Sequence, residues 1–308
     1  MAKKKDLDMV SSSAKVKLGA SDIIVRGIGY FVTTLYSLAC IFPFLVILGS
    51  SFSSESYLNL HGVQLIPGEF STEAYHAVMK SGLIWKSYIV TILITVTGTV
   101  IGLSLIAMTG YALQRKDFPF RNGISFYIYF TSLFSAGLAP YYLIMTQVYK
   151  LKDSYLAILL PLLMSPWLVI LMKNFVKSIP HEITESGKID GAGDMKIFTA
   201  LILPMLKPAL ATIGLFLALG YWNEWYQSSL FLSSRVDVKP LQYMLYETVN
   251  KTDALKNTVA GQYVVITDIP SNTVKMATAM LATGPIVLLY PFVQKYFISG
   301  ITVGAVKG

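Results

Sequence analysis

Charged residues, cysteine and histidine are all scarce in this 308-residue sequence. Charged residues make up 14% of the chain, whereas a soluble domain carries about a quarter. The single Cys40 excludes a disulfide within the chain. Hydrophobic residues make up 54%, and the mean hydropathy is +0.57. The shortage of charge therefore excludes an ordinary soluble domain and predicts an all-α, polytopic membrane protein.

Motifs for nucleotide binding and catalysis are also missing. No G-x-x-x-x-G-K-[ST] loop occurs, so we do not expect this chain to bind ATP through a P-loop. The segment from His181 to Glu185 lacks the second histidine of H-E-x-x-H, and His61 and His76 are expected across the membrane. We find neither a nucleophile elbow nor a paired-carboxylate site. The sequence predicts no catalytic residue, no metal site, no enzymatic role and no cofactor in this chain.

Six apolar segments are long enough to cross a bilayer, which needs about 20 residues. They are residues 28–50, 88–113, 123–149, 155–176, 209–232 and 276–297. Gly137 and Pro140 interrupt the third segment, and Pro161 and Pro166 break the fourth. The first segment is too long for the core of a cleavable signal peptide, and no small-residue cleavage site follows closely. The second contains Gly98-x-x-x-Gly102, a pattern that lets helices approach closely.

The distribution of basic residues predicts the topology. The formal net charge is +8, but these residues are spread over many loops, so we read them as topology signals and expect no nucleic-acid partner. The segments expected inside hold 16 of the 25 lysines and arginines. We therefore expect a cytoplasmic N-terminal tail (1–26), a six-span permease domain (27–297) and a cytoplasmic C-terminal tail (298–308), with an outer loop at 233–275.

A polar loop at residues 179–208 separates the fourth and fifth apolar segments and carries four acids and three lysines. Its first part, roughly 180–189, can form a short helix that bears Glu182 and Glu185. The small residues at 190–193 favour a sharp turn. Asp194 is placed to act as the N-cap of a second helix. Such a polar helix-turn-helix between membrane segments is suited to docking a soluble partner; the alternative is a solvated loop whose charges only set topology.

The pattern of this loop resembles the EAA loop of binding-protein-dependent ABC importer permeases. The matching positions are Glu185, Asp190, Gly191, Ala192, Phe198, Leu203, Pro204 and Pro208. The family's Glu-Ala-Ala reads Glu185-Ser186-Gly187 here, and we expect Gly187 to loosen the first helix. In the family this loop is a coupling helix that sits in a cleft of the ATPase subunit. The resemblance implies that the ATPase-coupling residues are Glu182, Glu185, Asp190, Gly191, Ala192, Phe198 and Pro204. Glu185 would pair with a basic ATPase residue, and Gly191 would allow the turn.

Two further stretches are similar to the carbohydrate class of these permeases. They are residues 221–225 (YWNEW), followed by 240–242 (PLQ), and the C-terminal residues 290–308. The second stretch looks like the branch often labelled LplC or YtcP, which is related to the maltose permease subunit MalG. The resemblance covers nearly the whole chain and implies a type I ABC importer permease (MetI-like) fold with six transmembrane helices and cytoplasmic coupling helices. It also implies that residues 300–308 reach toward the ATPase dimer interface.

The family resemblance implies an oligosaccharide importer with several partners. These are a second homologous permease subunit, two copies of an ABC ATPase subunit that binds ATP and Mg, and an extracellular sugar-binding protein. The expected location is the bacterial cell membrane, with multiple spans and both termini cytoplasmic. Other readings stay open: an ion-coupled secondary transporter of a small polar solute, a membrane scaffold, or an importer of a peptide or polyamine. A secondary transporter would be expected to carry more intramembrane ionisable residues and an inverted repeat.

Glu224 is the one acid within an expected span. Such a group is costly in lipid and usually faces a cavity or a partner. Aromatic and amide groups, which suit sugar rings and hydroxyls, surround it. The first reading is that this cluster lines the substrate pathway; the second is that Glu224 lies at the outer interface within an aromatic belt. The candidate pathway residues are Trp222, Asn223, Glu224 and Tyr226, with Phe134 and Tyr141 from the interrupted third segment. For the last two, packing or a place in an aromatic belt is the favoured alternative.

Overall fold

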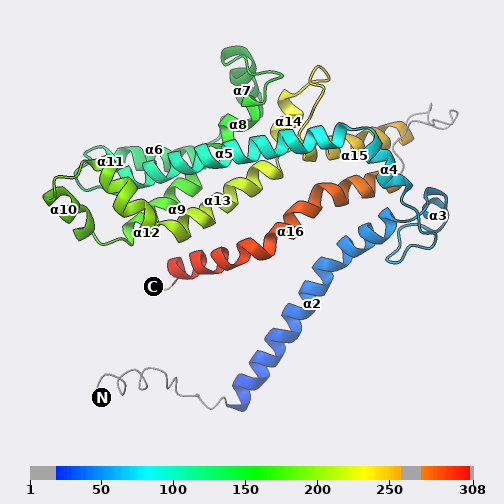
Figure 1. The fold of residues 1–308 in the computed structure, drawn as a ribbon, viewed down its shortest axis with the longest axis horizontal. Coiled ribbons are helices and arrows are strands. Elements are labelled where there is room, and N and C mark those ends of the chain that lie inside the picture. The colour runs from blue at the N-terminus through cyan, green and yellow to red at the C-terminus, as the bar shows by residue number, and fades with distance from the viewer. Residues whose placement is uncertain (1–18, 258–271, 306–308) are drawn as a thin grey trace.

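The apolar segments of the sequence form helices in the computed structural model, which describes residues 19–257 and 272–305 (Figure 1). An isolated β-bridge joins Ser53 and Phe70, and the described residues contain no strand. This confirms the all-α fold class. In chain order the elements are α2 (Ala20–Ser51), α3 (Glu55–His61), α4 (Glu73–Lys80), α5 (Leu83–Gln114), α6 (Arg121–Leu133), α7 (Leu138–Leu143), the π-helix η2 (Ile144–Val148), α8 (Leu156–Leu162), α9 (Pro166–Lys177), α10 (Glu182–Ile189), α11 (Asp194–Lys196), the π-helix η3 (Ile197–Ile202), α12 (Leu203–Met205), α13 (Lys207–Trp222), α14 (Tyr226–Phe231), α15 (Leu241–Asn257) and α16 (Asn272–Ala305).

Helix α5 is the central element of the bundle and packs against α9 and α13. Ile106 of α5, Met172 of α9 and Ile213 of α13 are fully buried members of one apolar core. The glycines of the Gly98-x-x-x-Gly102 pattern permit this close packing. A Cβ atom on Gly102 would lie 2.9 Å from the carbonyl oxygen of Leu163, between α8 and α9. The small-residue pattern therefore marks a packing face within this chain.

Several of the expected spans are bent or broken. α2 and α5 are each long and apolar enough to cross a membrane alone. The pairs α6 with α7–η2, α8 with α9, and α11–α12 with α13–α14 qualify as broken spans, bent by 113°, 40° and 84°. The structure thus supports up to five spans by length and composition. α16 lies where the sixth span is expected but is not among these five, so the count of six stays a prediction.

The breaks predicted in the third and fourth segments are confirmed at Gly137 and Pro166, whereas Pro140 lies within α7 and Pro161 within α8. Gly137, with φ of +89°, ends the connection between α6 and α7 in a conformation that favours glycine. The chain bends by 113° there, an angle that the sequence did not predict. Pro166 begins α9, where the missing N–H of proline is tolerated.

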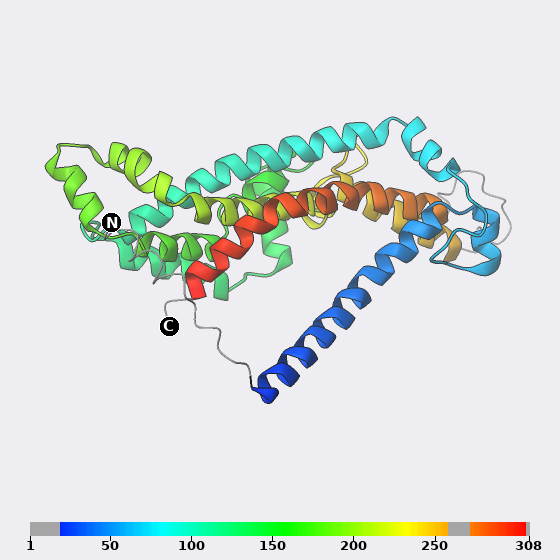
Figure 2. The same cartoon turned by 60° about the horizontal axis from the view of Figure 1, so that its bottom comes forward.

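Helix α2 leaves the bundle along most of its length (Figures 1 and 2). Its residues are exposed up to Leu45, and burial begins only at its C-terminal end, where Ser50 and Ser51 are fully buried. α2 begins at Ala20, ahead of the expected start of the first span. The earlier part of the expected N-terminal tail (1–26) lies outside the described residues.

The two ends of α5 carry different structures. The short helices α3 and α4 lie at one end, and α10 protrudes at the other (Figures 1 and 2). At the first end Glu55 of α3 accepts hydrogen bonds from the backbone N–H groups of Asn272 and Thr273, at 3.0 and 2.9 Å, and so caps the start of α16. The expected outer loop (233–275) contains α15, and its residues 258–271 lie outside the described part, as do residues 306–308 of the C-terminal tail.

Candidate functional site

The loop at residues 179–208 forms the predicted helix-turn-helix at the protruding end. α10 carries Glu182 and Glu185, as predicted, and ends at Ile189. Gly191 then adopts φ of +75°. A Cβ atom there would meet nothing within 4 Å, so glycine is favoured at this position by backbone conformation and not by space. The chain continues through α11, η3 and α12 into α13, with Pro204 exposed in α12.

The prediction that Asp194 caps the second helix is wrong. Gly193 is the N-cap residue, and Asp194 is the first residue of α11, without a side-chain capping hydrogen bond. The Asp194 carboxylate instead pairs with Arg115, with 2.5 Å between Oδ1 and Nη1. The guanidinium offers the carboxylate a donor that is itself charged, in place of the neutral backbone N–H of a helix cap.

The structure gives Gly187 a packing role that the sequence did not predict. Gly187 is buried where α10 crosses η3. A Cβ atom at this position would lie 3.0 Å from Ile197 Cγ1 and 3.1 Å from Leu201 Cδ1, closer than most Cβ contacts. The expectation that Gly187 loosens α10 is therefore incomplete, since the absence of a side chain also lets α10 pack tightly on the following π-helix.

The proposed coupling residues divide into exposed and packed groups. Glu182, Glu185, Asp190 and Gly191 are exposed, and the Glu185 side chain is 63% accessible, with Oε1 4.0 Å from His181 Nδ1. Phe198 is buried and its ring lies 5.2 Å from that of Tyr111, and Ala192 packs against the same core. The exposed group can contact a partner, whereas the packed group ties the loop to the bundle.

Sequence reasoning missed two apolar side chains on the same surface. Ile189 is 85% exposed at the end of α10, and Met195 is 63% exposed in α11, on the other side of the Gly191 turn. Isolated apolar residues within a strongly polar loop were the available signal. Together with the exposed acids they form a mixed surface of the kind that a protein partner covers.

A network of four charged residues connects this loop to the turn between α5 and α6. Lys188 Nζ lies 2.7 Å from Asp117 Oδ2. Arg115 contacts Asp117 through two nitrogens, at 2.9 Å (Nε–Oδ1) and 2.5 Å (Nη2–Oδ2), and also reaches Asp194. The hydrogen bonds from Arg115 and Lys188 hold the pKa of Asp117 well below its usual range, and those to Asp117 and Asp194 raise the pKa of Arg115. Asp117 and Arg115 are therefore both charged near neutral pH.

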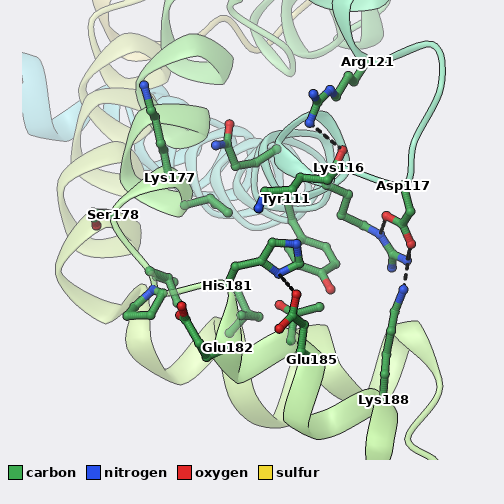
Figure 3. A pocket seen from close by; sticks show the side chains of 17 residues that line it. Tyr111, Lys116, Asp117, Arg121, Lys177, Ser178, His181, Glu182, Glu185 and Lys188 are labelled. Carbon is green, nitrogen blue, oxygen red and sulfur yellow. Dashed lines mark hydrogen bonds and ion pairs between the residues drawn. The ribbon is translucent and has the colours of Figure 1, made fainter.

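A pocket of about 790 Å³ lies between α10 and the ends of α5 and α9 (Figure 3). Its lining includes Lys116, Arg121 and Lys177 on one side and Glu182 and Glu185 on the other. Among the described residues no group of three His, Cys, Asp or Glu side chains is arranged to hold a metal ion. Beside the pocket, Ile183 of α10 packs against the core that includes Tyr111 of α5.

Glu224 lies in the break between α13 and α14 and is only 8% exposed. It accepts hydrogen bonds from the backbone N–H of Gln227 and, at 3.2 Å, of Ser228, and from the Ser228 hydroxyl at 2.7 Å. These donors lie in the first turn of α14, so the carboxylate satisfies groups that a helix start leaves unpaired. This structural role was missed, while both readings of Glu224 stay predictions.

The remaining pathway candidates differ in their exposure and in whether they contact the residues of this break. Trp222 donates from Nε1 to the carbonyl of Ala282 in α16, at 3.3 Å, and is half-buried. Asn223 and Tyr226 are exposed. Tyr141 joins the group because its hydroxyl donates to Gln227 Oε1 at 2.9 Å. Phe134 does not show such a link; it is exposed and stacks on Phe130, with centroids 4.4 Å apart.

Two exposed aromatic side chains beside this break stack on each other, a contact that the sequence did not predict. Trp225 and Tyr246 stack with centroids 4.5 Å apart and an interplanar angle of 22°. They are 41% and 40% exposed. Tyr246 lies on α15, within the expected outer loop, and its distance along the sequence concealed the contact. The pair offers an aromatic surface next to the polar Asn223.

Comparison with known proteins identifies the family. The model of the family described as "Binding-protein-dependent transport system inner membrane component" matches residues 102–303, which include the loop, the charged network and the α13–α14 break. A crystal structure of a bacterial ABC transporter involved in the import of the acidic polysaccharide alginate contains a similar chain. It superposes with a TM-score of 0.78 at 31% identity and covers 91% of this chain and 98% of that one.

Two relatives from Bacillus subtilis (strain 168) match over most of the sequence. The polygalacturonan/rhamnogalacturonan transport system permease protein YtcP is 35% identical over 279 residues, which cover 91% of this chain and 96% of that protein. Protein LplC is 34% identical over 275 residues, which cover 87% and 90%. The similarity therefore extends over nearly the full length of both relatives.

Proposed function

Because the chain belongs to the family of binding-protein-dependent transport system inner membrane components, we propose that it is a permease subunit of an ATP-driven importer for oligosaccharides. The family is a transport permease family, not an enzyme family. One observation carries the proposal: an apolar helical bundle presents a polar, exposed helix-turn-helix at a single end (Figures 1 and 2). A permease subunit without its own P-loop requires a surface to which an ATPase subunit can bind and through which it can move the membrane helices.

The coupling surface of the proposed importer consists of Glu182, Glu185, Ile189 and Met195. All four are exposed, and they lie on both sides of the Gly191 turn. An ATPase cleft would bury the two apolar side chains and pair Glu185 with a basic residue. Two ATPase copies, one for this chain and one for a second permease, would bind ATP and Mg and would drive the closure that moves α10.

The proposed substrate pathway surrounds the break between α13 and α14. Breaks in membrane helices occur where the backbone lines a cavity or is buried in protein. Asn223, Tyr226, Trp225 and Tyr246 are exposed there and offer amide, hydroxyl and aromatic groups. The names of the polygalacturonan and alginate transport proteins support a saccharide substrate. A second, similar permease would complete the path, and an extracellular binding protein would deliver the sugar.

The proposed location is the bacterial cell membrane, with the α10 end in the cytoplasm and the α3–α4 end outside. Both chain termini would then be cytoplasmic. The exposed, apolar α2 would lie in lipid or against the second permease. This orientation follows from the excess of lysine and arginine in the segments at the α10 end.

The test is to purify the tagged chain from its host in mild detergent and to identify bound subunits by mass. We expect a second permease and a P-loop ATPase. The complex is then reconstituted with its binding protein in proteoliposomes, and uptake of neutral maltodextrins, oligogalacturonides and alginate oligosaccharides is measured with and without internal ATP. Recovery of a homodimer that takes up solute without ATP would contradict the proposal and support an ion-coupled secondary transporter.

A further inference from the structure

Apolar and ionic contacts both join the loop to the bundle. Gly187 of α10 packs on Ile197 and Leu201 of η3, which leads through α12 into α13, and Ile183 of α10 packs against the main core. The ionic contacts run from Lys188 of α10 and Asp194 of α11 to the turn between α5 and α6. They lie beside the 790 Å³ pocket and link the loop directly to the end of α5 (Figure 3).

We propose that Arg115, Asp117, Lys188 and Asp194 form an ionic clamp that transmits the movement of α10 to helix α5. This inference rests on the proposed function, in which an ATPase moves α10. The clamp holds the loop on both sides of the Gly191 turn. Lys188 precedes this turn and reaches Asp117, whereas Asp194 follows it and reaches Arg115; Arg115 and Asp117 contact each other within the α5–α6 turn.

The geometry of Arg115 makes the clamp stronger than separate surface ion pairs. An isolated exposed pair contributes little, but networks and two-point guanidinium–carboxylate contacts contribute more. Arg115 makes the two-point contact with Asp117 and the further contact with Asp194, and its side chain is only 15% exposed. Asp117 in turn accepts from both Arg115 and Lys188. No pair in the network can separate without changing the others.

Helix α5 is suited to receive this movement because it packs tightly along its length. Arg115 directly follows Gln114, the last residue of α5. Five residues earlier, a Cβ atom on Gly110 would lie 2.6 Å from Met172 Cγ in α9. In the middle of α5, a Cβ atom on Gly98 would lie 2.3 Å from Tyr221 Cζ of α13. A displacement at Arg115 is therefore passed to the helix as a whole, and through α5 to its neighbours.

The test uses charge inversion in the assembled complex. The first half inversion is Arg115→Glu with Asp117→Lys, and the second is Lys188→Glu with Asp194→Lys. Each leaves the net charge unchanged but places like charges opposite one another across the clamp. The quadruple variant restores an opposite charge at every contact. Lys196→Glu, on the same exposed loop, is the control, because it alters the charge of the loop more than either half inversion does.

The readout reports movement of α5 and does not require a known substrate. In a Cys40→Ser background, Lys86→Cys near the far end of α5 carries an environment-sensitive dye; at 1.5 Å per residue this label lies roughly 40 Å from Arg115. Purified complexes in nanodiscs receive MgATP and vanadate, and both the dye response and the basal ATP hydrolysis are recorded. We expect each half inversion to decrease the dye response about fivefold or more while hydrolysis continues. We expect the quadruple variant and Lys196→Glu to respond within about twofold of the parent.

A dye response that persists in both half inversions would overturn the clamp. So would a quadruple variant whose dye response is no larger than that of the half inversion with the smaller response. If a half inversion prevents assembly, Lys188→Met with Asp194→Asn removes the contacts without repulsion and is judged by the same criterion. A parent complex that hydrolyses ATP without moving the dye would also contradict the inference. The absence of any co-purified ATPase would instead overturn the proposed function.

Discussion

Gly98 of α5 lies directly against the aromatic ring of Tyr221 in α13. A Cβ atom on Gly98 would lie 2.3 Å from Tyr221 Cζ and 2.4 Å from Cε2. The ring cannot move aside freely, because Tyr221 is 2% exposed and its hydroxyl donates to the carbonyl of Leu159 at 2.8 Å. The contact between α5 and α13 at Gly98 therefore has no room for even one methyl group.

We expect Gly98→Ala to destabilise the protein by about 1–3 kcal/mol, as overpacking of a filled core does. The gain in helix propensity from glycine to alanine, about 1 kcal/mol, offsets part of the cost. The measurement is the thermal midpoint of the purified complex. Gly220→Ala is the matched control, since a Cβ atom there meets nothing within 4 Å. Equal midpoints for the two variants would show that α5 and α13 can separate at no cost.

Replacing the exposed apolar residues of the coupling surface should weaken ATPase binding. We expect Ile189→Asp and Met195→Asp each to decrease recovery of the ATPase in co-purification, by about tenfold if the side chain is a central contact. Both variants should fold, because both side chains are exposed. Leu60→Asp is the control: Leu60 is 81% exposed in α3, at the opposite end of the molecule. Undiminished recovery with both variants would place the ATPase contact elsewhere.

The stabilisation supplied by Asp117 should not change across the physiological pH range. Its pKa in the folded protein is lowered, so its contribution is present above the unfolded pKa of about 3.9 and is lost as the pH falls through the folded value. We therefore expect the difference in thermal midpoint between wild type and Asp117→Asn to be constant from about pH 5 to pH 8. A difference that falls between pH 8 and pH 6 would mean that another group controls the network.

Substitutions at Glu224 should separate its structural role from a transport role. Glu224→Ala leaves the buried Ser228 and the start of α14 without their acceptor, so we expect a loss of about 1–3 kcal/mol in stability. Glu224→Gln keeps one acceptor oxygen and should lose less. Thermal midpoint and oligosaccharide uptake are measured on the same preparations. A Glu224→Gln complex with a wild-type midpoint but without uptake would favour the pathway reading, whereas normal midpoint and uptake for Glu224→Ala would contradict the capping role.

Local sequence chemistry was sufficient to predict the coupling loop. The short helix that carries Glu182 and Glu185, and the turn at Gly191, depend on residues within a few positions of each other, and both are confirmed. The helix break near Gly137 was predictable for the same reason. The angle of that bend was not predictable, because Tyr141 and Tyr142 of α7 pack against Phe231 of α14, a later segment that the local sequence does not specify.

Contacts between distant segments account for part of what sequence reasoning missed. Asp194 looks like a helix cap in its own segment, but it pairs with Arg115, which precedes it in another loop. Gly187 looks like a helix breaker, but Ile197 and Leu201 fill the space above it. The break at residues 223–225 contains neither proline nor glycine, and Glu224 stabilises it through α14. The contact between Asp194 and Arg115 depends on a partner that the local segment cannot specify, whereas Glu224 pairs with Gln227 and Ser228 only three and four residues later and was a local signal that sequence reasoning missed.

The cap that Glu55 provides for α16 also sets an order of events during synthesis. Glu55 precedes Asn272 by 217 residues, so their contact cannot form until almost the whole chain has left the ribosome. At about 5–20 residues per second, this delay is roughly 10 to 40 s. Helices α5, α9 and α13 can insert and pack in that interval, before the start of α16 is available to contact Glu55 of α3. The end of the bundle at α3 is therefore the last part to close, and a nascent chain arrested before residue 272 would be left with that end open.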